Sequence, residues 1–178
     1  MPLVIEMPPR EEQLAFNRSR WGDVLRDPEL AKLPGKVETD RHGQILIMPP
    51  PSGSHSSKQS CILLALHGCL GGKPLAECPI STADGVRAAD VGWYSPERFR
   101  QVDGQDAFEE APEICVEVVS PSNTPRGLAE KRDLYFDAGA EEVWICQLDG
   151  EMQFYLKGDP TVPASRSALC PGFQARVE

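Results

Sequence analysis

Three charged side chains in the second half of the sequence, Asp90, Glu117 and Lys131, are of the types that metal-assisted hydrolysis uses. Asp90 stands in or at the end of a short predicted strand, and Glu117 stands in the middle of the next strong one. Adjacent strands lie about 4.8 Å apart, so carboxylates on paired strands can share one divalent cation. Mg²⁺ prefers such oxygen ligands, together with water and substrate phosphate. Lys131, on the helix predicted after the Glu117 strand, is the best-placed cation to orient a water molecule or to neutralise phosphate charge.

The strand predicted at residues 113–120 is apolar on both faces except for Glu117. One face carries Ile114, Val116 and Val118, and the other carries Cys115, Glu117 and Val119. Two apolar faces are typical of a central strand that is covered on both sides. A buried carboxylate in that position is costly unless a cation, a metal ion or good hydrogen bonds compensate its charge. The sequence therefore predicts a partner for Glu117.

The elements that position these residues follow from periodicity and from proline and glycine punctuation. Two strands with a turn at His42-Gly43 are expected within residues 36–48, and Ser54 is expected to cap a helix at about residues 55–69. Thr124-Pro125 predicts the start of a helix over residues 126–138. Further strands are expected at residues 76–80, 88–94, 142–148 and 151–156, and the remainder of the chain is expected to be a loop with a short closing segment. This order predicts an α/β fold in which helices flank a mixed central sheet of five or six strands.

The chain of 178 residues is expected to divide into an N-terminal extension, residues 1–36, and a main domain, residues 37–178. The extension contains a predicted helix between Glu11 and Leu25. Its first ten residues are too rich in proline for a signal sequence, and no segment approaches the roughly 20 apolar residues of a membrane span. The six cysteines have no C-x-x-C spacing, which favours reduced thiols in a cytoplasmic protein and argues against a zinc or redox centre.

The net charge of −9 argues against an extended surface that coats nucleic acid without specificity. An acidic chain can still meet DNA through a local groove, particularly where bound metal offsets the carboxylates. Composition therefore restricts the kind of nucleic-acid contact without excluding a nuclease.

In several segments that follow one another in the expected order, the chain resembles the Uma-two family of restriction-endonuclease-like proteins, part of the PD-(D/E)XK nuclease superfamily. The segments cover most of residues 37–156 together with Pro171-Gly172-Phe173. They are Pro50-Pro51-Ser52-Gly53-Ser54-His55, Ala89-Asp90-Val91, residues 112–122, Lys131 with Tyr135 and Gly139, and Val143-Trp144-Ile145. The resemblance implies a restriction-endonuclease-like core for residues 37–178.

The resemblance also implies the roles of individual residues. Asp90 and Glu117 match the acidic metal ligands of the motif, and the main-chain carbonyl of Val118 is a further implied ligand for Mg²⁺, with Mn²⁺ as a substitute. Val119 stands where the superfamily has lysine, and Lys131 matches a lysine that has moved to the following helix. Ala89 replaces the motif's proline, whose role there is conformational. Glu38 and His55 correspond to an additional acidic residue and to a recurrent histidine.

Each residue also has a purely structural interpretation. Glu117 could form an ordinary ion pair, and Asp90 could lie on the surface of an edge strand. Lys131 sits among exposed charges, where solvation is the default, and His55 could serve only in the capping region of a helix. Asp90, Glu117 and Lys131 occurring together in the expected order favours the functional interpretation.

Two functions follow from the sequence. The first is a Mg²⁺-dependent endonuclease that hydrolyses phosphodiesters in DNA, with Asp90, Glu117 and Lys131 as catalytic residues. A homodimer would suit it, because cutting both strands needs two sites. The alternative is a catalytically inactive nucleic-acid-binding or assembly module on the same fold, which the acidity of the chain and Val119 favour.

Overall fold

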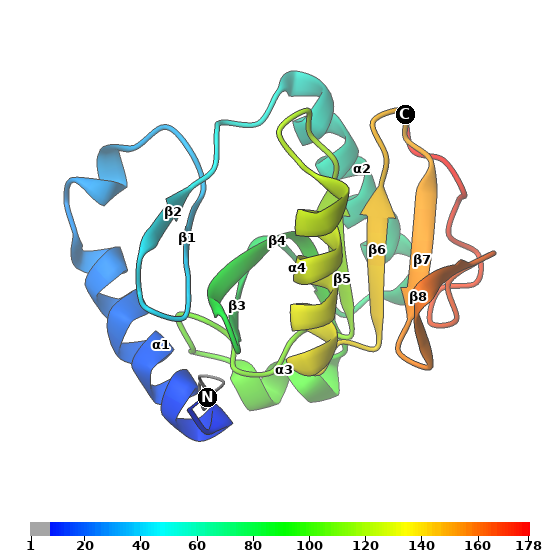
Figure 1. The fold of residues 1–178 in the computed structure, drawn as a ribbon. Coiled ribbons are helices and arrows are strands. Elements are labelled where there is room, and N and C mark those ends of the chain that lie inside the picture. Colours follow the sequence, from blue (N-terminus) through cyan, green and yellow to red (C-terminus); the bar gives the residue numbers. More distant parts are fainter. Residues whose placement is uncertain (1–7) are drawn as a thin grey trace, which may run out of the picture.

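A six-stranded mixed sheet forms the centre of the computed structural model, which describes residues 8–178 (Figure 1). The strand order is β3-β4-β5-β6-β7-β8, and β5 and β6 are parallel while the other neighbours are antiparallel. The predicted α/β fold with a mixed sheet is confirmed. The strands are β3 (Lys73–Thr82), β4 (Gly85–Tyr94), β5 (Ile114–Val118), β6 (Glu142–Cys146), β7 (Met152–Leu156) and β8 (Asp159–Ala164).

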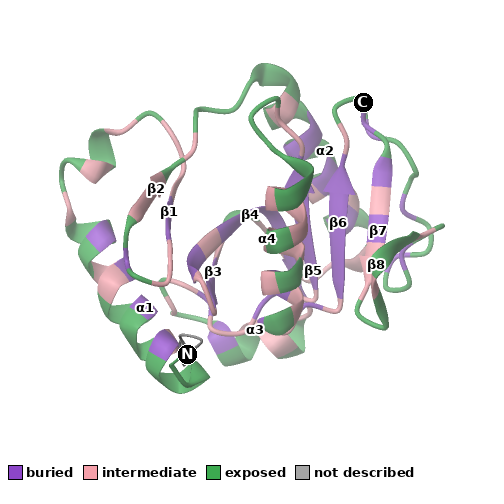
Figure 2. Cartoon of the chain, viewed as in Figure 1, coloured by how far each residue is buried: buried purple, intermediate pink, exposed green. Residues whose placement is uncertain are grey.

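Two long helices cover opposite faces of this sheet, α2 (Gly53–Leu70) and α4 (Pro125–Asp137) (Figure 1). Ile62 and Leu66 of α2 pack in one core cluster with Ile114, Val116 and Val118. Tyr135 of α4 packs in the other cluster with Cys115. The alternation predicted for β5 is therefore confirmed, and β5 and β6 are buried along their whole length (Figure 2). A short helix, α3 (Pro96–Val102), follows β4.

The segment before the sheet packs onto its β3–β4 end. Helix α1 (Arg10–Arg26) confirms the helix expected between Glu11 and Leu25, and Asn17 donates to Ser81 Oγ at 3.0 Å and to the Thr82 carbonyl at 2.9 Å. A 3₁₀ turn, η1 (Leu30–Lys32), then leads to the antiparallel pair β1 (Val37–Thr39) and β2 (Ile45–Ile47). Residues 1–7 of the expected extension lie outside the described residues, and a domain boundary at residue 36 stays a prediction.

Two local expectations were wrong. The cap of α2 is Ser52, whose hydroxyl accepts from the His55 N–H, so the cap lies two residues before the expected Ser54 and the helix begins at Gly53. Residues 159–164, expected to be a loop because of Pro160 and Pro163, form strand β8. Proline is tolerated on an edge strand, because the outer side of such a strand has no partner that needs its missing N–H.

The C-terminal segment is attached to the sheet by the buried carboxylate of Glu142. This side chain accepts from Trp144 Nε1 at 2.7 Å, from Ala168 N at 2.8 Å and from Leu169 N at 2.7 Å. Three donors replace the water that the carboxylate loses on burial, which explains its position in the core. No helix in residues 8–178 is both long and apolar enough to cross a membrane.

Glu142→Gln is expected to lower the free energy of unfolding by about 1–3 kcal/mol. The reason is that the glutamine NH₂ would face at least one of the N–H groups that donate to the Glu142 carboxylate in the wild type, and two donors cannot bond to each other. Urea denaturation followed by tryptophan fluorescence measures the change. Glu151→Gln, at an exposed position, is the control and should stay within about 0.5 kcal/mol of the wild type. Equal stability of the two variants would show that the Glu142 contacts do not stabilise the fold.

Candidate active site

The candidate site begins where strands β4 and β5 stop pairing. Their ladder contains Val91↔Val116, Gly92↔Cys115 and Trp93↔Ile114, and the next pair in this register would be Asp90 with Glu117. Beyond Val91 a side chain of β4 replaces its backbone as the hydrogen-bond acceptor, since Asp90 Oδ2 accepts from the Val118 N–H at 2.7 Å. The two acidic residues predicted from the sequence are therefore brought to the same point, where the sheet opens.

Asp90 is held by the Lys36 ammonium and the His55 imidazole as well as by the backbone. Lys36 Nζ lies 2.7 Å from its Oδ1, and His55 Nε2 lies 3.3 Å from its Oδ2. Burial by itself raises the pKa of Asp90, but the His55 hydrogen bond and the Lys36 charge outweigh it and keep that pKa below its ordinary value. The same hydrogen bond raises the pKa of His55. Asp90 is therefore an ionised, immobilised carboxylate.

Glu117 has partners of a different kind. Tyr135 donates from its hydroxyl to Oε1 at 2.6 Å, and Lys131 Nζ lies 3.3 Å from both carboxylate oxygens. Burial raises the pKa of Glu117, and the charge of Asp90 adds to this effect while Lys131 opposes it. Two carboxylates in one small site repel each other, so each ionises less readily than it would alone. Additional positive charge would therefore favour the ionised form of Glu117.

Lys131 lies between two buried carboxylates. Its Nζ is 2.8 Å from Oε1 of Glu38, a side chain with no exposed surface, and it also contacts Glu117. Burial lowers the pKa of Lys131, but the charges of Glu117 and Glu38 outweigh burial and raise this pKa above its ordinary value. The ammonium therefore stays protonated. Burial likewise disfavours ionisation of Glu38, yet the charge of Lys131 holds the pKa of this carboxyl below its ordinary value.

The sequence analysis missed two members of this cluster, Lys36 and Glu77. Lys36 Nζ contacts the Ala88 carbonyl at 2.9 Å and Glu77 Oε2 at 3.4 Å in addition to Asp90. Burial lowers the pKa of Lys36, but the charges of Glu117, Asp90 and Glu77 raise it above its ordinary value. Glu77 has a positive φ of 51°, which is uncommon for a residue with a side chain and often marks functional sites. No motif in the sequence indicates either residue.

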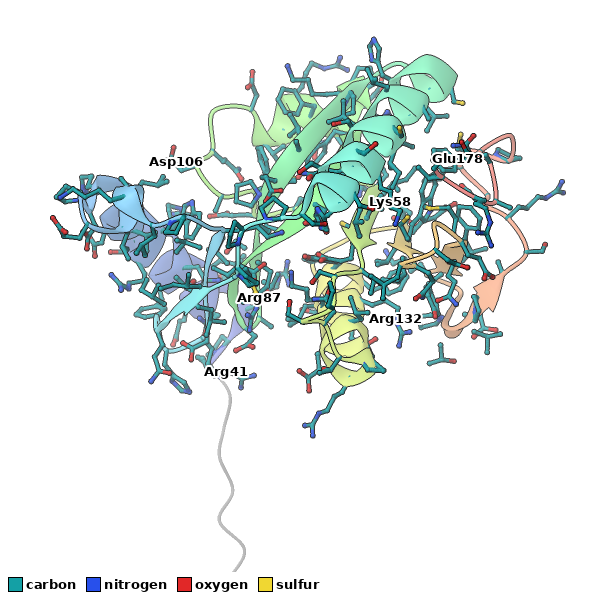
Figure 3. The ribbon with its side chains drawn as sticks, turned by 90° about the horizontal axis from the view of Figure 1, so that it is seen from above. Arg41, Lys58, Arg87, Asp106, Arg132 and Glu178 are labelled. Atoms are coloured by element: carbon teal, nitrogen blue, oxygen red, sulfur yellow. The ribbon has the colours of Figure 1, made fainter. Side chains whose placement is uncertain are left out.

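The charged groups of this cluster other than Glu38 form the floor of a cleft of about 720 Å³. The hairpin β1–β2 lies on one side and α4 lies between this hairpin and the C-terminal strands, an arrangement seen from above in Figure 3. Two exposed loops, residues 49–52 and 120–123, form part of the rim. His55 also lines the cleft, and its Nδ1 is buried without a hydrogen-bond partner among residues 8–178. The site therefore has polar capacity left for a ligand.

A divalent cation fits the charge of this site. Glu38 is compensated by Lys131 and Arg87 together. The remaining carboxylates, those of Glu77, Asp90 and Glu117, face the two ammonium groups of Lys36 and Lys131, which leaves an excess of negative charge when His55 is neutral. The described part of the chain has no group of three or more His, Cys, Asp or Glu arranged to hold a metal ion. Mg²⁺ does not need such a group, since it is usually bound by one or two carboxylates and several waters.

The comparisons agree with this architecture. Residues 27–161 match the protein family described as "Uma2: Putative restriction endonuclease". The chain belongs to the Uma2 family. The fold of this chain is similar to that of a protein from Anabaena variabilis, whose crystal structure is described as that of a "putative nuclease belonging to DUF820". The TM-score is 0.61 at 18% sequence identity, over 83% of this chain and 92% of the other. No curated protein matches the chain.

The geometry of this Uma2 chain tests the purely structural interpretations of Asp90, Lys131 and Glu117. Asp90 is 4% exposed in the second strand of the sheet, so it is not a surface residue of an edge strand. Lys131 is ion-paired and not solvated. Val119 packs at the margin of the core cluster around Cys115. The ion pair considered for Glu117 is present, and its partner is the same Lys131 that the family resemblance implies.

Lys131→Met is expected to lower the free energy of unfolding by about 3 kcal/mol, because it leaves Glu38 and Glu117 buried without their shared cation. Arg126→Met, at a 90% exposed side chain on the same helix, is the control and should cost less than about 0.5 kcal/mol. The double variant Lys131→Met/Glu38→Gln should recover part of the loss. Urea denaturation curves of these three variants, the single variant Glu38→Gln and the wild type measure this, and additive effects of Lys131→Met and Glu38→Gln would contradict the proposed coupling.

Proposed function

We propose that this Uma2 protein is a Mg²⁺-dependent endonuclease that hydrolyses phosphodiester bonds in DNA. The observation that carries the proposal is the convergence of Asp90 and Glu117 where β4 and β5 separate, with Lys131 beside Glu117 at the floor of a cleft. The description of the family as restriction endonucleases and the similarity of the fold to a nuclease-like protein support this chemistry.

In this proposal Asp90 and Glu117 hold the metal ion, with the Val118 carbonyl as the further ligand that the family resemblance implies. Mg²⁺, when bound, neutralises phosphate charge and makes a coordinated water more acidic. The protein's own groups prepare the site. Lys36 and the Val118 N–H fix the Asp90 carboxylate, and the Tyr135 hydroxyl fixes Glu117. Such preorganised groups need little rearrangement at the moment of reaction.

Lys131 replaces the lysine that is missing at position 119. Its ammonium is held charged by Glu38 and Glu117, so it can donate to a phosphate oxygen or to the attacking water. Lys131 on α4 and Glu117 on β5 thus provide together the lysine and the acidic residue that the superfamily's motif carries on one strand. Lys131 is accordingly a catalytic residue in this proposal, and Glu38 is the residue that positions it.

A binding module without turnover is the second candidate. The observation that favours it is that Lys36 and Lys131 already compensate much of the carboxylate charge. In such a module the buried ion pairs would stabilise the fold, and DNA or a protein partner would bind without hydrolysis. The two candidates differ in whether the site takes up a metal ion.

Asp90→Asn and Glu117→Gln are each expected to reduce Mg²⁺-dependent cleavage of plasmid DNA by more than about 100-fold, because each removes one of the proposed carboxylate ligands. Nicking and linearisation are followed on agarose gels, and circular dichroism checks that both variants keep the fold. Glu130→Gln, at an exposed carboxylate one residue before Lys131, is the matched control and should cut like the wild type. Undiminished cleavage by both site variants would contradict the assignment.

Calorimetric titration with Mn²⁺ separates the two candidate functions. The endonuclease predicts saturable binding that both Asp90→Asn and Glu117→Gln weaken by at least about tenfold, since each loses a carboxylate ligand. The absence of Mn²⁺ binding that depends on these residues, together with binding of DNA, would favour the module.

A further inference from the structure

The cleft above the charged floor has an apolar wall that the hydrolytic chemistry does not use. Its members include Trp21, Met48, Pro49, Pro51, Pro79 and Pro121. Trp21 comes from α1 and Met48 follows β2, so much of this wall is supplied by the segment that precedes the sheet. An apolar surface beside a few convergent polar groups is the usual composition of a site that encloses a small organic group.

The wall is fixed relative to the floor. The Met48 N–H donates to the Lys36 carbonyl at 2.8 Å. This hydrogen bond joins the segment that supplies part of the wall to the segment that supplies Lys36 to the floor. Gly35 makes the close approach possible, since a Cβ atom there would lie 2.1 Å from the Met48 carbonyl oxygen. Lys36 and Met48 both line the cleft, so one ligand can contact the two residues.

The cations of the cleft are too few to follow the backbone of a duplex. In the part of the chain that the structure describes, the basic groups that line the cleft are the ammonium groups of Lys36 and Lys131 and the His55 imidazole, and each lies against a carboxylate. Duplex DNA carries one negative charge per about 1.7 Å of helix axis, and proteins that bind it neutralise several phosphates at once. The floor of this cleft can compensate only one or two.

A stiff duplex is also a poor fit to the depth of the site. The side chains of Asp90 and Glu117 are each 5% exposed, so a scissile phosphate reaches them only by entering the cleft. A cavity of about 720 Å³ is within the size range that encloses one small ligand. Nucleotides of an unpaired strand can enter such a space singly, and their bases have apolar faces that stack on side chains.

We propose that the apolar wall binds one unpaired nucleobase next to the scissile phosphodiester, so that the substrate is single-stranded or locally unpaired DNA. This inference rests on the proposed function and specifies its substrate class. The sugar-phosphate would lie over Lys36 and Lys131, and the base would lie against Met48 and the prolines of the rim.

The test measures binding by fluorescence anisotropy, with Ca²⁺ in place of Mg²⁺ and with gels to check that the DNA stays intact. Three labelled probes of equal length are compared: a single strand, its blunt duplex and a sugar-phosphate strand that lacks bases. The single strand should bind about tenfold more tightly than either of the others, a loss typical of one stacked base. Equal affinity for the duplex, or for the strand without bases, overturns the proposal.

A variant of the wall tests the position of the base. Met48→Ser should weaken binding of the single strand by about tenfold and leave binding of the strand without bases unchanged, since only the apolar contact is lost. Val162→Ser, at a 58% exposed position on the opposite edge strand β8, is the matched control and should bind like the wild type. Unchanged binding of the single strand by Met48→Ser overturns the assignment of the wall.

The dependence on salt gives an independent measurement. Between 50 and 200 mM salt, the affinity for the single strand should fall by less than about tenfold, because few phosphates are neutralised. A loss of about a thousandfold would instead indicate a surface that follows the backbone, and would contradict the proposal.

Cleavage of the same probes with Mg²⁺ distinguishes failure of this inference from failure of the proposed function. Cutting of the duplex at least as fast as of the single strand, abolished by Asp90→Asn, overturns the inference and keeps the endonuclease. Base-dependent binding without any cleavage that depends on Asp90 rejects the endonuclease and keeps the unpaired base as the ligand of the wall.

Discussion

A carboxylate buried within a sheet has to be compensated, and Glu117 imposes that requirement on the elements around it. It lies on β5, which is buried along its whole length, and its compensation comes from Lys131 and Tyr135 on α4. Lys131 in turn binds Glu38 of β1. One charged group on the central strand thus joins a helix and the N-terminal hairpin at a single point, because leaving any member unpaired in this environment would be costly.

The cleft exists because β4 changes partners along its length. It pairs with β3 on both sides of Asp90, but with β5 only from Val91 onwards. A strand that loses a neighbour would normally leave unpaired backbone groups. Here the side chains of β1 replace the missing strand, since Thr39 Oγ1 accepts from Val86 N and Glu38 Oε1 accepts from Ala88 N, both at 3.0 Å. The N–H groups of Val86 and Ala88 therefore keep acceptors although β5 does not reach this part of β4.

The parts of this arrangement that could be predicted from the sequence are those with local signals. The alternation around Glu117 gave both faces of β5, and Thr124-Pro125 gave the start of the helix that carries Lys131. Lys36 and Glu77 could not be predicted, because neither contact has a local signal. Lys36 reaches Asp90 from the residue before β1, and Glu77 reaches Lys36 from an unusual backbone conformation in β3. Strand β8 was missed because its prolines are unfavourable in a strand unless the strand lies at an edge.

The ion pair between Lys131 and Glu38 joins residues that are 93 positions apart in the chain. Contacts of such separation form late, because the entropy of closing a long loop has to be overcome before the contact stabilises anything. A ribosome-bound chain that ends before α4 has the carboxylates of Glu38 and Glu117 but not the ammonium that holds both of them. The complete charge cluster therefore requires a chain that extends through α4, and a copy that ends before this helix cannot form it.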